Sequence, residues 1–183
     1  GKIGDARLAG PLLDTLDAKR PIPVGIVSMS LLHLGPAAIE GLTAGLSSKS
    51  ATVRSTSAEL LGMHGAIGAA RRLVSMSETD PSEVVRASAA AALGRIGVPS
   101  TVEVLERITA IGNSQAVRVA AATSLGQVGS RESIGTLHLL VADEDEEVAH
   151  ASARALVEFG GPGAAVLDLA AGGEGPGAQS ARH

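Results

Sequence analysis

Apolar and small residues recur along this chain with a period of about 32 residues, a length that suits a pair of helices. In three blocks a Val-Arg pair opens an apolar run that closes on glycine: VRSTSAELLGMHG from Val53, VRASAAAALGRIG from Val85 and VRVAAATSLGQVG from Val117. Degenerate copies begin at Val24 and Val148. The closing glycines are Gly35, Gly65, Gly97, Gly129 and Gly160, spaced 30, 32, 32 and 31 residues apart. This periodicity predicts an array of stacked helical units.

A second apolar marker keeps the same period and indicates the second helix of each unit. Its positions are Leu13, Leu42, Leu73, Leu105, Leu137 and Leu169. Val102, Leu105 and Ile108 form one face of a helix. The predicted first helices cover 24–34 and 150–159 and start after Ser50, Ser82 and Ser114; the predicted second helices cover 4–16, 36–46, 66–76, 100–110, 132–141 and 163–171.

Polar residues mark where the first helices begin, and glycines mark where they end. Ser50, Ser82 and Ser114 stand three residues before the Val of their units, and Asp145 stands likewise before Val148. The side-chain oxygens of Ser and Asp accept hydrogen bonds from free N–H groups at a helix start. The closing glycines can adopt the left-handed conformation that ends a helix. An inner glycine recurs within the last turn of these helices as Gly62, Gly94 and Gly126. Glycine there destabilises a helix by about 1 kcal/mol relative to Ala. Its recurrence despite this cost predicts a close contact with another helix that leaves no room for a side chain.

The pattern defines one repeat domain over residues 1–171. Residues 4–16 correspond to the second helix of a unit whose first helix is missing, as expected of a segment of a longer protein; the alternative is a natural half-repeat that caps the array. Residues 172–183 are Gly-rich without an apolar pattern, and we expect them to be disordered. The predicted fold class is all-α, a right-handed α–α superhelix of about five and a half helix pairs.

Composition narrows the choice of core and of partner. The aromatic content is 1%, with Phe159 the only aromatic residue, so Ala, Leu, Val and Ile must form the core. Slim side chains bury little area each, and stability must therefore come from stacking. A net charge of −4 and the lack of Trp and Tyr disfavour nucleic acid as a partner. The sequence has no Cys, which excludes disulfides and thiolate metal sites.

The repeats resemble HEAT repeats, specifically the short class also seen in phycobilin lyases, over about residues 4–171. The matching residues are Val85, Arg86, Ala89, Ala90, Ala92, Leu93, Gly94 and Gly97, with Pro11 and Leu13 in a second helix. In that family the Arg commonly pairs with an acidic residue of a neighbouring turn. The resemblance therefore implies a structural ladder of Arg54, Arg86 and Arg118, which Gly25 and Ala149 interrupt in the end copies. We expect Arg86 and Arg118 to reach a carboxylate or carbonyl, with Asp80 the partner of one.

Metal and catalytic sites find little support. HEAT-like di-iron hydroxylases carry repeated His-Glu pairs, but here His33, His64, His138 and His150 are followed by Leu, Gly, Leu and Ala. We therefore expect no catalytic residue, no metal and no cofactor. The acidic run 143–147 does not match a calcium loop. We interpret it as a solvated turn before a helix start; the alternative is a site for a cation or a basic partner.

The resemblance implies that the second helices line the concave side of the solenoid. The residues expected to bind a partner there are Arg71, Ser75, Glu103, Glu106, Arg107 and His138. Mixed charge suits a protein or peptide partner better than a polyanion.

The preferred interpretation is therefore a non-enzymatic protein-binding scaffold. We expect a cytoplasmic location, or a membrane tether on a segment not present here, with no direct membrane insertion by this segment. The excess of Arg over Lys suggests a bacterial origin. The alternatives are a bilin-lyase-like enzyme or enzyme subunit that handles a prosthetic group, and a spacer between other domains.

Overall fold

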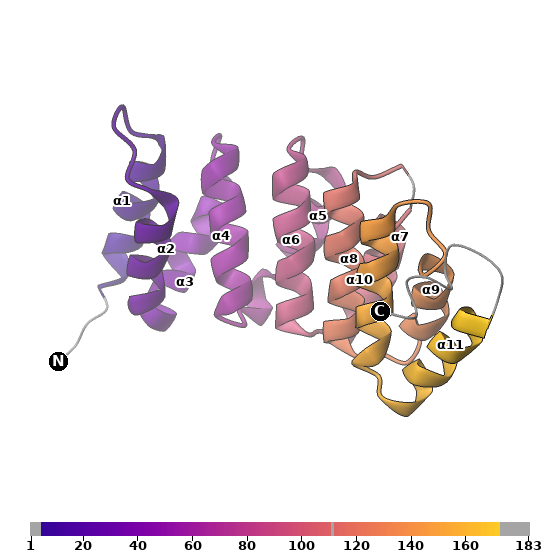
Figure 1. Cartoon of the computed structure of the whole chain (residues 1–183). Helices are drawn as coiled ribbons and strands as arrows, with labels where there is room; N and C mark the ends of the chain where they lie inside the picture. Colours follow the sequence, from indigo (N-terminus) through magenta and orange to yellow (C-terminus); the bar gives the residue numbers. More distant parts are fainter. Residues whose placement is uncertain (1–4, 111, 173–183) are drawn as a thin grey trace.

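In this computed structural model, which describes residues 5–110 and 112–172, all regular structure is helical. The first helices are α2 (Val24–His33), α4 (Ala51–Met63), α6 (Glu83–Ile96), α8 (Gln115–Val128) and α10 (Glu146–Val157). The second helices are α1 (Ala9–Asp14), α3 (Ile39–Gly45), α5 (Ala70–Thr79), α7 (Val102–Ile108), α9 (Ser133–Leu140) and α11 (Gly161–Gly172). Short 3-10 turns are η1 (Ala6–Leu8), η2 (Thr15–Asp17), η3 (Gly35–Ala38), η4 (Ile67–Ala69) and η5 (Pro99–Thr101). The predicted all-α solenoid is confirmed, with α1 preceding five helix pairs (Figure 1).

The helices form two layers with a continuous apolar core between them. Figure 1 shows α4, α6, α8 and α10 as one layer, with α5 and α7 behind it. Each helix of the first layer contributes a buried leucine at the equivalent position, namely Leu31, Leu61, Leu93, Leu125 and Leu156, and α4 adds Leu60. The second layer contributes the marker leucines Leu13, Leu42, Leu73, Leu105 and Leu137, which are also buried. Aliphatic side chains, repeated once per helix, therefore fill the core as the composition predicted.

The last marker position departs from this pattern. Leu169 keeps the period of the marker leucines, but it is 74% exposed. Helix α11 instead approaches α10 through Gly163, which lies against the carbonyl of Leu156 and leaves no room for a Cβ. Val166 and Leu167 of α11 pack partly buried against the core. The last second helix therefore packs in a different register from the others. Of residues 172–183, which were expected to be disordered, Gly172 is the last residue of α11 and residues 173–183 lie outside the described residues.

The four predicted helix starts are confirmed, but the capping chemistry is not uniform. Ser50 and Asp145 accept hydrogen bonds from N–H groups in the first turns of α4 and α10. Ser82 and Ser114 occupy the N-cap positions of α6 and α8 without a side-chain capping bond. At α6 the backbone N–H of Ser82 instead donates to a carboxylate oxygen of Asp80 at 2.9 Å. The turn before α6 is thus fixed by an aspartate that also belongs to the arginine ladder described below.

The closing glycines end the first helices as predicted. Gly35, Gly65, Gly97, Gly129 and Gly160 have φ of +60°, +60°, +70°, +70° and +63°. In this left-handed region a side chain with a Cβ is strained. The period seen in the sequence is therefore the spacing of the left-handed turns between the two layers.

The inner glycines make the predicted close contacts. A Cβ on Gly62 would lie 2.7 Å from the Cα of Ala92 on the next first helix, closer than such atoms pack. The contact recurs in three pairs: Gly62 with Ala92, Gly94 with Ser124, and Gly126 with Ala155. The hydroxyl of Ser124 also donates to the carbonyl of Ala90 at 2.9 Å. Neighbouring first helices therefore meet backbone to backbone at Gly62 and Gly126, and backbone to side chain at Gly94.

The two layers differ in how closely their helices stand. From α4 to α10 the first helices contact one another over much of their length, whereas successive second helices touch at few points. An array bends toward the row whose members stand closer together. This packing indicates that the first helices form the inner side, and it runs against the expectation that the second helices line the concave side.

The glycine contact can be tested with a matched pair of substitutions. Gly62→Ala should lower the free energy of unfolding by about 1–3 kcal/mol, because the added methyl group overpacks the contact with Ala92. Gly68→Ala, where a Cβ would meet nothing within 4 Å, should change stability by less than about 1 kcal/mol. Urea unfolding followed by circular dichroism at 222 nm measures both. Equal effects of the two changes would contradict a steric role for Gly62.

Candidate functional site

The six residues expected to bind a partner lie on three successive second helices. Arg71 and Ser75 are on α5, Glu103, Glu106 and Arg107 are on α7, and His138 is on α9. All are exposed except Glu106, which is half-buried. We call these six residues the second-helix face. It carries two arginines, two glutamates, one serine and one histidine.

Hydrogen bonds between helices hold part of this face in place. The guanidinium of Arg107 donates to Glu78 of α5 at 2.7 Å and to Glu103 of its own helix at 3.0 Å. The hydrogen bond with Glu78 raises the pKa of Arg107. Glu106 accepts a hydrogen bond from the hydroxyl of Thr136 on α9 at 2.9 Å. The side chains of α7 are therefore connected to both neighbouring second helices.

The sequence analysis did not identify Glu78 and Thr136 as parts of this arrangement. Glu78 lies 29 residues before Arg107, and Thr136 lies 30 residues after Glu106. Each separation is close to one repeat, so the two pairs join equivalent neighbourhoods of adjacent units. The period alone could have indicated them, because residues one repeat apart face one another in a stacked array.

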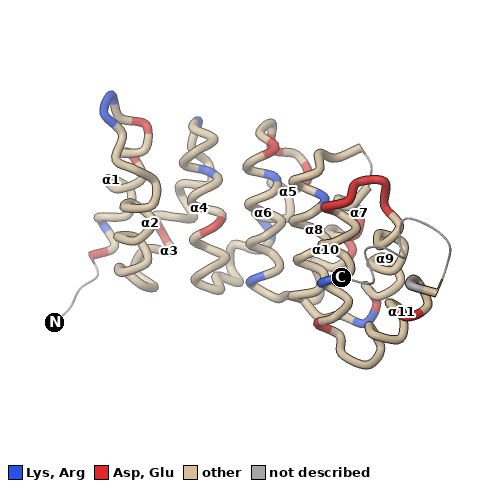
Figure 2. Tube along the Cα trace, viewed as in Figure 1, with Lys and Arg blue, Asp and Glu red and all other residues tan. Residues whose placement is uncertain are grey.

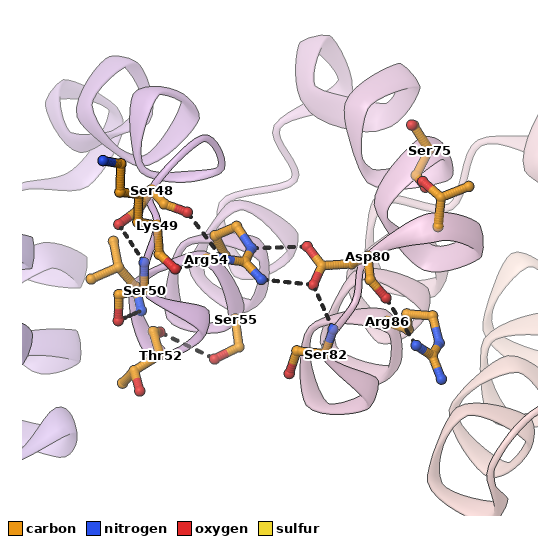
Figure 3. Close-up of polar contacts among 12 residues, drawn as sticks. Ser48, Lys49, Ser50, Thr52, Arg54, Ser55, Ser75, Asp80, Ser82 and Arg86 are labelled. Atoms are coloured by element: carbon orange, nitrogen blue, oxygen red, sulfur yellow. Dashed lines mark hydrogen bonds and ion pairs between the residues drawn. The ribbon is translucent and has the colours of Figure 1, made fainter.

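The arginine ladder lies in the turns that precede the first helices. Arg54 donates through two nitrogens to the two carboxylate oxygens of Asp80, both at 2.8 Å (Figure 3). Its remaining amino group donates to the carbonyls of Ser48 at 3.0 Å and Lys49 at 3.1 Å. One arginine side chain therefore joins the turn before its own helix to the turn of the following unit.

Arg86 and Arg118 make the kinds of contact expected of them. Arg86 donates to the carbonyl of Asp80 at 2.9 Å. Arg118 is buried, donates to the carbonyl of Thr109 at 2.8 Å and forms an ion pair with the carboxylate of Asp143. Asp80 thus serves two arginines, its carboxylate binding Arg54 and its carbonyl binding Arg86.

The ionisation of Asp80 reflects this environment. Burial opposes the charged form, but hydrogen bonds from Arg54 and from the N–H of Ser82, with the charges of Arg54 and Arg86, outweigh it and lower the pKa of Asp80. The hydrogen bond to Asp80 likewise raises the pKa of Arg54. The pair is therefore charged over the whole neutral range.

One connection of the ladder is missing. Asp80 stands six residues before Arg86, and Asp143 stands six residues before Ala149; the same position before Arg118 is Gly112. Arg54 and Arg118 each reach forward to the aspartate at this position of the following unit. For Arg86 the position is occupied by Gly112, and the buried Nε of Arg86 has no hydrogen-bond partner among residues 5–110 and 112–172.

The acidic run 143–147 covers the end of the turn between α9 and α10 and the first two residues of α10, visible in red in Figure 2. Asp143 binds Arg118, and Asp145 caps α10 while also accepting a hydrogen bond from Gln115 at 3.0 Å. The hydrogen bond from Gln115, with those from the capped N–H groups, lowers the pKa of Asp145 against weak desolvation. Within residues 5–110 and 112–172, no three His, Cys, Asp or Glu side chains are grouped to hold a metal ion.

In the described part of the chain no single helix is long and apolar enough to cross a membrane. Only a pair bent by 120°, Val24–His33 with Gly35–Gly45, meets the criteria, and it does so by length and composition alone.

The fold and the ladder together define an α-solenoid built from short helix pairs. The family of HEAT repeats matches residues 39–114 and 110–171. Since these segments cover more than half of the sequence, the chain belongs to the HEAT repeat family. A comparison with curated proteins finds no match.

Solved structures with this fold share little sequence with the chain. The complex of CpcE and CpcF of phycocyanin lyase from Nostoc sp. PCC7120 has a TM-score of 0.65 at 20% identity, over 95% of this chain and 73% of the matched chain. Computationally designed armadillo repeat proteins for modular peptide recognition give 0.60 at 18%, over 97% and 98%. Human deoxyhypusine hydroxylase gives 0.55 at 21%, over 91% and 68%. At these identities the likeness establishes the fold alone.

The charged contact between Arg54 and Asp80 predicts a pH-dependent stability. Asp80→Asn should lower the free energy of unfolding at pH 7 by about 1–3 kcal/mol, because it removes a charged acceptor from a largely buried pair. In the unfolded chain the pKa of Asp80 is about 3.9, and in the folded protein it lies below that value. Its contribution is therefore present above that pH and is lost as the pH falls through the folded-state pKa. Urea unfolding from pH 7 to pH 2 should show the wild type and the variant converging in acid, whereas the exposed control Asp14→Asn should track the wild type throughout.

The missing connection predicts a stabilising substitution. Gly112→Asp should place a carboxylate within reach of Arg86 and raise the free energy of unfolding by up to about 1 kcal/mol, as a partly exposed ion pair does. Gly112→Asn is the control of similar shape without the charge. In a double-mutant cycle the gain should disappear when Arg86 is replaced by Ala. A gain that persists without Arg86 would show that the ladder is not the cause.

Proposed function

We propose that this chain is a non-enzymatic scaffold that binds a protein or peptide through the second-helix face. The observation that carries the proposal is the fixed arrangement of opposite charges across α5 and α7, centred on Arg107 and joined to α9 through Thr136. Side chains that are already held in place lose less conformational entropy on binding than free ones. A rigid array of small-residue helices provides such a display without a deep pocket.

The exposed charged and polar side chains of the second-helix face determine which class of partner we expect it to bind. Arg71 is exposed and joins no ion pair among the described residues, so it is available to a carboxylate of a partner. Glu103 remains largely exposed beside Arg107, and His138 adds a group that can donate or accept. Because both signs of charge occur together, the face suits a polar peptide or protein surface better than nucleic acid.

The designed armadillo proteins of the same fold are described as made for peptide recognition, which supports this use of a helical array. We place this activity in the cytoplasm.

A second candidate rests on the likeness to the CpcE and CpcF complex. That complex is described as a phycocyanin lyase. In this alternative the chain is a subunit that handles a prosthetic group together with another chain. The second-helix face is then an interface between enzyme subunits.

A site-specific photo-crosslinker distinguishes a binding face from an inert surface. Placed at Ser75 in cells that make the protein, it should give a discrete adduct with one partner. At the exposed position Thr123 on α8 it should give none. Arg107→Glu should abolish the adduct at Ser75, because it reverses the central charge. Adducts of equal yield at Ser75 and Thr123 would contradict the proposal.

The absorbance spectrum of the purified chain tests the enzyme alternative. The sequence contains no Trp or Tyr, so its own absorbance above 250 nm is that of Phe159 alone. The scaffold proposal predicts no visible band in chain purified from its own cells. A stoichiometric visible band would overturn that proposal and favour the prosthetic-group alternative.

A further inference from the structure

Two of the three ladder arginines bind an aspartate of the following unit, and the third, Arg86, does not. The position that would serve Arg86 is Gly112. Its side chain is only 18% exposed, and the acidic group paired with it is Glu83, which is 62% exposed. The 3.7 Å between their closest atoms is too long for a hydrogen bond. Arg86 is therefore a largely buried cation that no carboxylate of the described chain binds through a hydrogen bond.

The guanidinium of Arg86 is oriented like that of Arg54. In both side chains Nη1 donates to the carbonyl six residues earlier, that of Ser48 at 3.0 Å for Arg54 and that of Asp80 at 2.9 Å for Arg86 (Figure 3). In Arg54 the Nε and Nη2 atoms then donate to the two carboxylate oxygens of Asp80. In Arg86 the buried Nε has no partner among the described residues. The same two nitrogens of Arg86 thus offer the fork that matches the two oxygens of a carboxylate.

In the two units that have an aspartate at this position, its carboxylate also accepts a backbone N–H group. The N–H of Ser82 donates to Asp80 and that of Asp145 donates to Asp143, both at 2.9 Å. The equivalent residue in the α8 unit is Ser114, and the glycine two residues before it has no side chain to accept this N–H. The hydroxyl of Ser114 is buried and also has no partner in the described part of the chain. Ser114 therefore supplies further donors beside the same position.

A positive charge flanks this position on each side. At the equivalent Asp80, the arginine of the preceding unit and Arg86 of the same unit both lower the pKa. Around Gly112 the arginines in the equivalent places are Arg86 and Arg118. Arg118 donates to the carbonyl of Thr109, in the turn that contains Gly112. The electrostatic environment that favours an ionised aspartate in the other units is thus present here, without the aspartate.

The turn has room for an added group at this position. Gly112 is exposed, and a Cβ built on it would meet nothing within 4 Å. A small group can therefore reach the place where the side chain of an aspartate would begin.

We propose that the turn before α8 binds a carboxylate from outside the chain, held by Nε and Nη2 of Arg86 and by the donors of Ser114. The bound group takes the place of the aspartate side chain in the equivalent turns, and it completes the ladder between α6 and α8. The carboxylate belongs either to a small organic acid or to an acidic side chain of a partner protein, since the recognising chemistry is the same. The site lies apart from the second-helix face and does not rest on the proposed scaffold function.

The test follows the Nε–H resonance of Arg86 by nuclear magnetic resonance in the full ¹⁵N-labelled chain. Formate replaces chloride at constant ionic strength and neutral pH, and the resonance, assigned by its loss in Arg86→Lys, should shift saturably. In Gly112→Asp the resonance should not respond to formate, because the new carboxylate occupies the fork. The matched control is Gly68→Asp, since a Cβ on Gly68 also meets nothing within 4 Å; it should respond as the wild type does.

Urea unfolding gives a second readout that does not depend on this resonance. Formate should raise the urea midpoint of the wild type, because a ligand that binds only the folded chain stabilises it. Arg86→Lys should raise the formate concentration for half of this effect by about tenfold or more, because a lysine cannot offer two parallel donors. Circular dichroism should show the wild-type helix content in this variant before urea is added.

Two probes separate the two sources of the carboxylate. Saturable binding of both formate and an N-acetylated aspartyl amide would show that an acidic side chain of a partner can reach Arg86. Binding of formate alone would assign the site to small organic acids.

A response to formate that does not saturate, or one that is equal in the wild type and in Gly112→Asp, would overturn the proposal. The crosslinked adduct at Ser75 should form equally in Gly112→Asp and in the wild type. Failure of this site is therefore distinguishable from failure of the second-helix face.

Discussion

The backbone contact between neighbouring first helices is the constraint on which the rest of the structure depends. At Gly62 and Gly126 the glycine lies against the backbone of a small residue on the next first helix, and at Gly94 it lies against the side chains of Ser124 and Gln127. The distance between units is fixed at Gly62 and Gly126, because no rotamer change can relieve a backbone contact. The leucine core, the positions of the turns and the reach of the arginines all follow from that distance. The core is almost free of aromatic residues, which is consistent with this close spacing because large rings would hold the helices apart.

The arginine ladder adds a polar link on top of this apolar contact. Arg54 reaches Asp80, and Arg118 reaches Asp143, across one inter-repeat turn each. Both pairs are largely buried, which carries a desolvation cost. That cost is offset because additional hydrogen bonds to the same charged groups accompany each ion pair. At Arg86 the forward aspartate is replaced by Gly112, and in the described part of the chain the polar contacts of this guanidinium are with its own preceding turn and with Glu83. The ladder therefore reinforces the array at alternate junctions rather than uniformly.

Much of this architecture was predictable because residues with the same structural role recur at equivalent positions of each repeat. The left-handed glycines, the helix starts and the glycine contacts each recur at one period, and each has one physical explanation. The register of α11 was not predictable, because Leu169 keeps the period while Gly163 makes the contact with α10. The curvature was not predictable either, since it depends on the relative spacing of two layers. Of the second-helix face, the sequence identified Arg107 and Glu106 as surface residues but not their partners Glu78 and Thr136. The repeat period could have indicated both partners, which lie 29 and 30 residues away, but the hydrogen bonds themselves depend on the three-dimensional alignment between units.

The junctions between successive first helices are of two kinds, and this difference limits where repeats can be added or removed. Units from α4 to α10 share one interface, a glycine facing a small residue, whereas the α2–α4 junction has leucine at both equivalent positions. Removal of the unit spanning residues 83–114 would bring Gly62 opposite Ser124 and recreate the same type of contact. Insertion of a second copy of that unit would do so as well. Moving the α2 unit into the interior would instead set Leu32 against a small residue and misplace the helices. Gain or loss of repeats by duplication is therefore permitted in the middle of the array and restricted at its first junction.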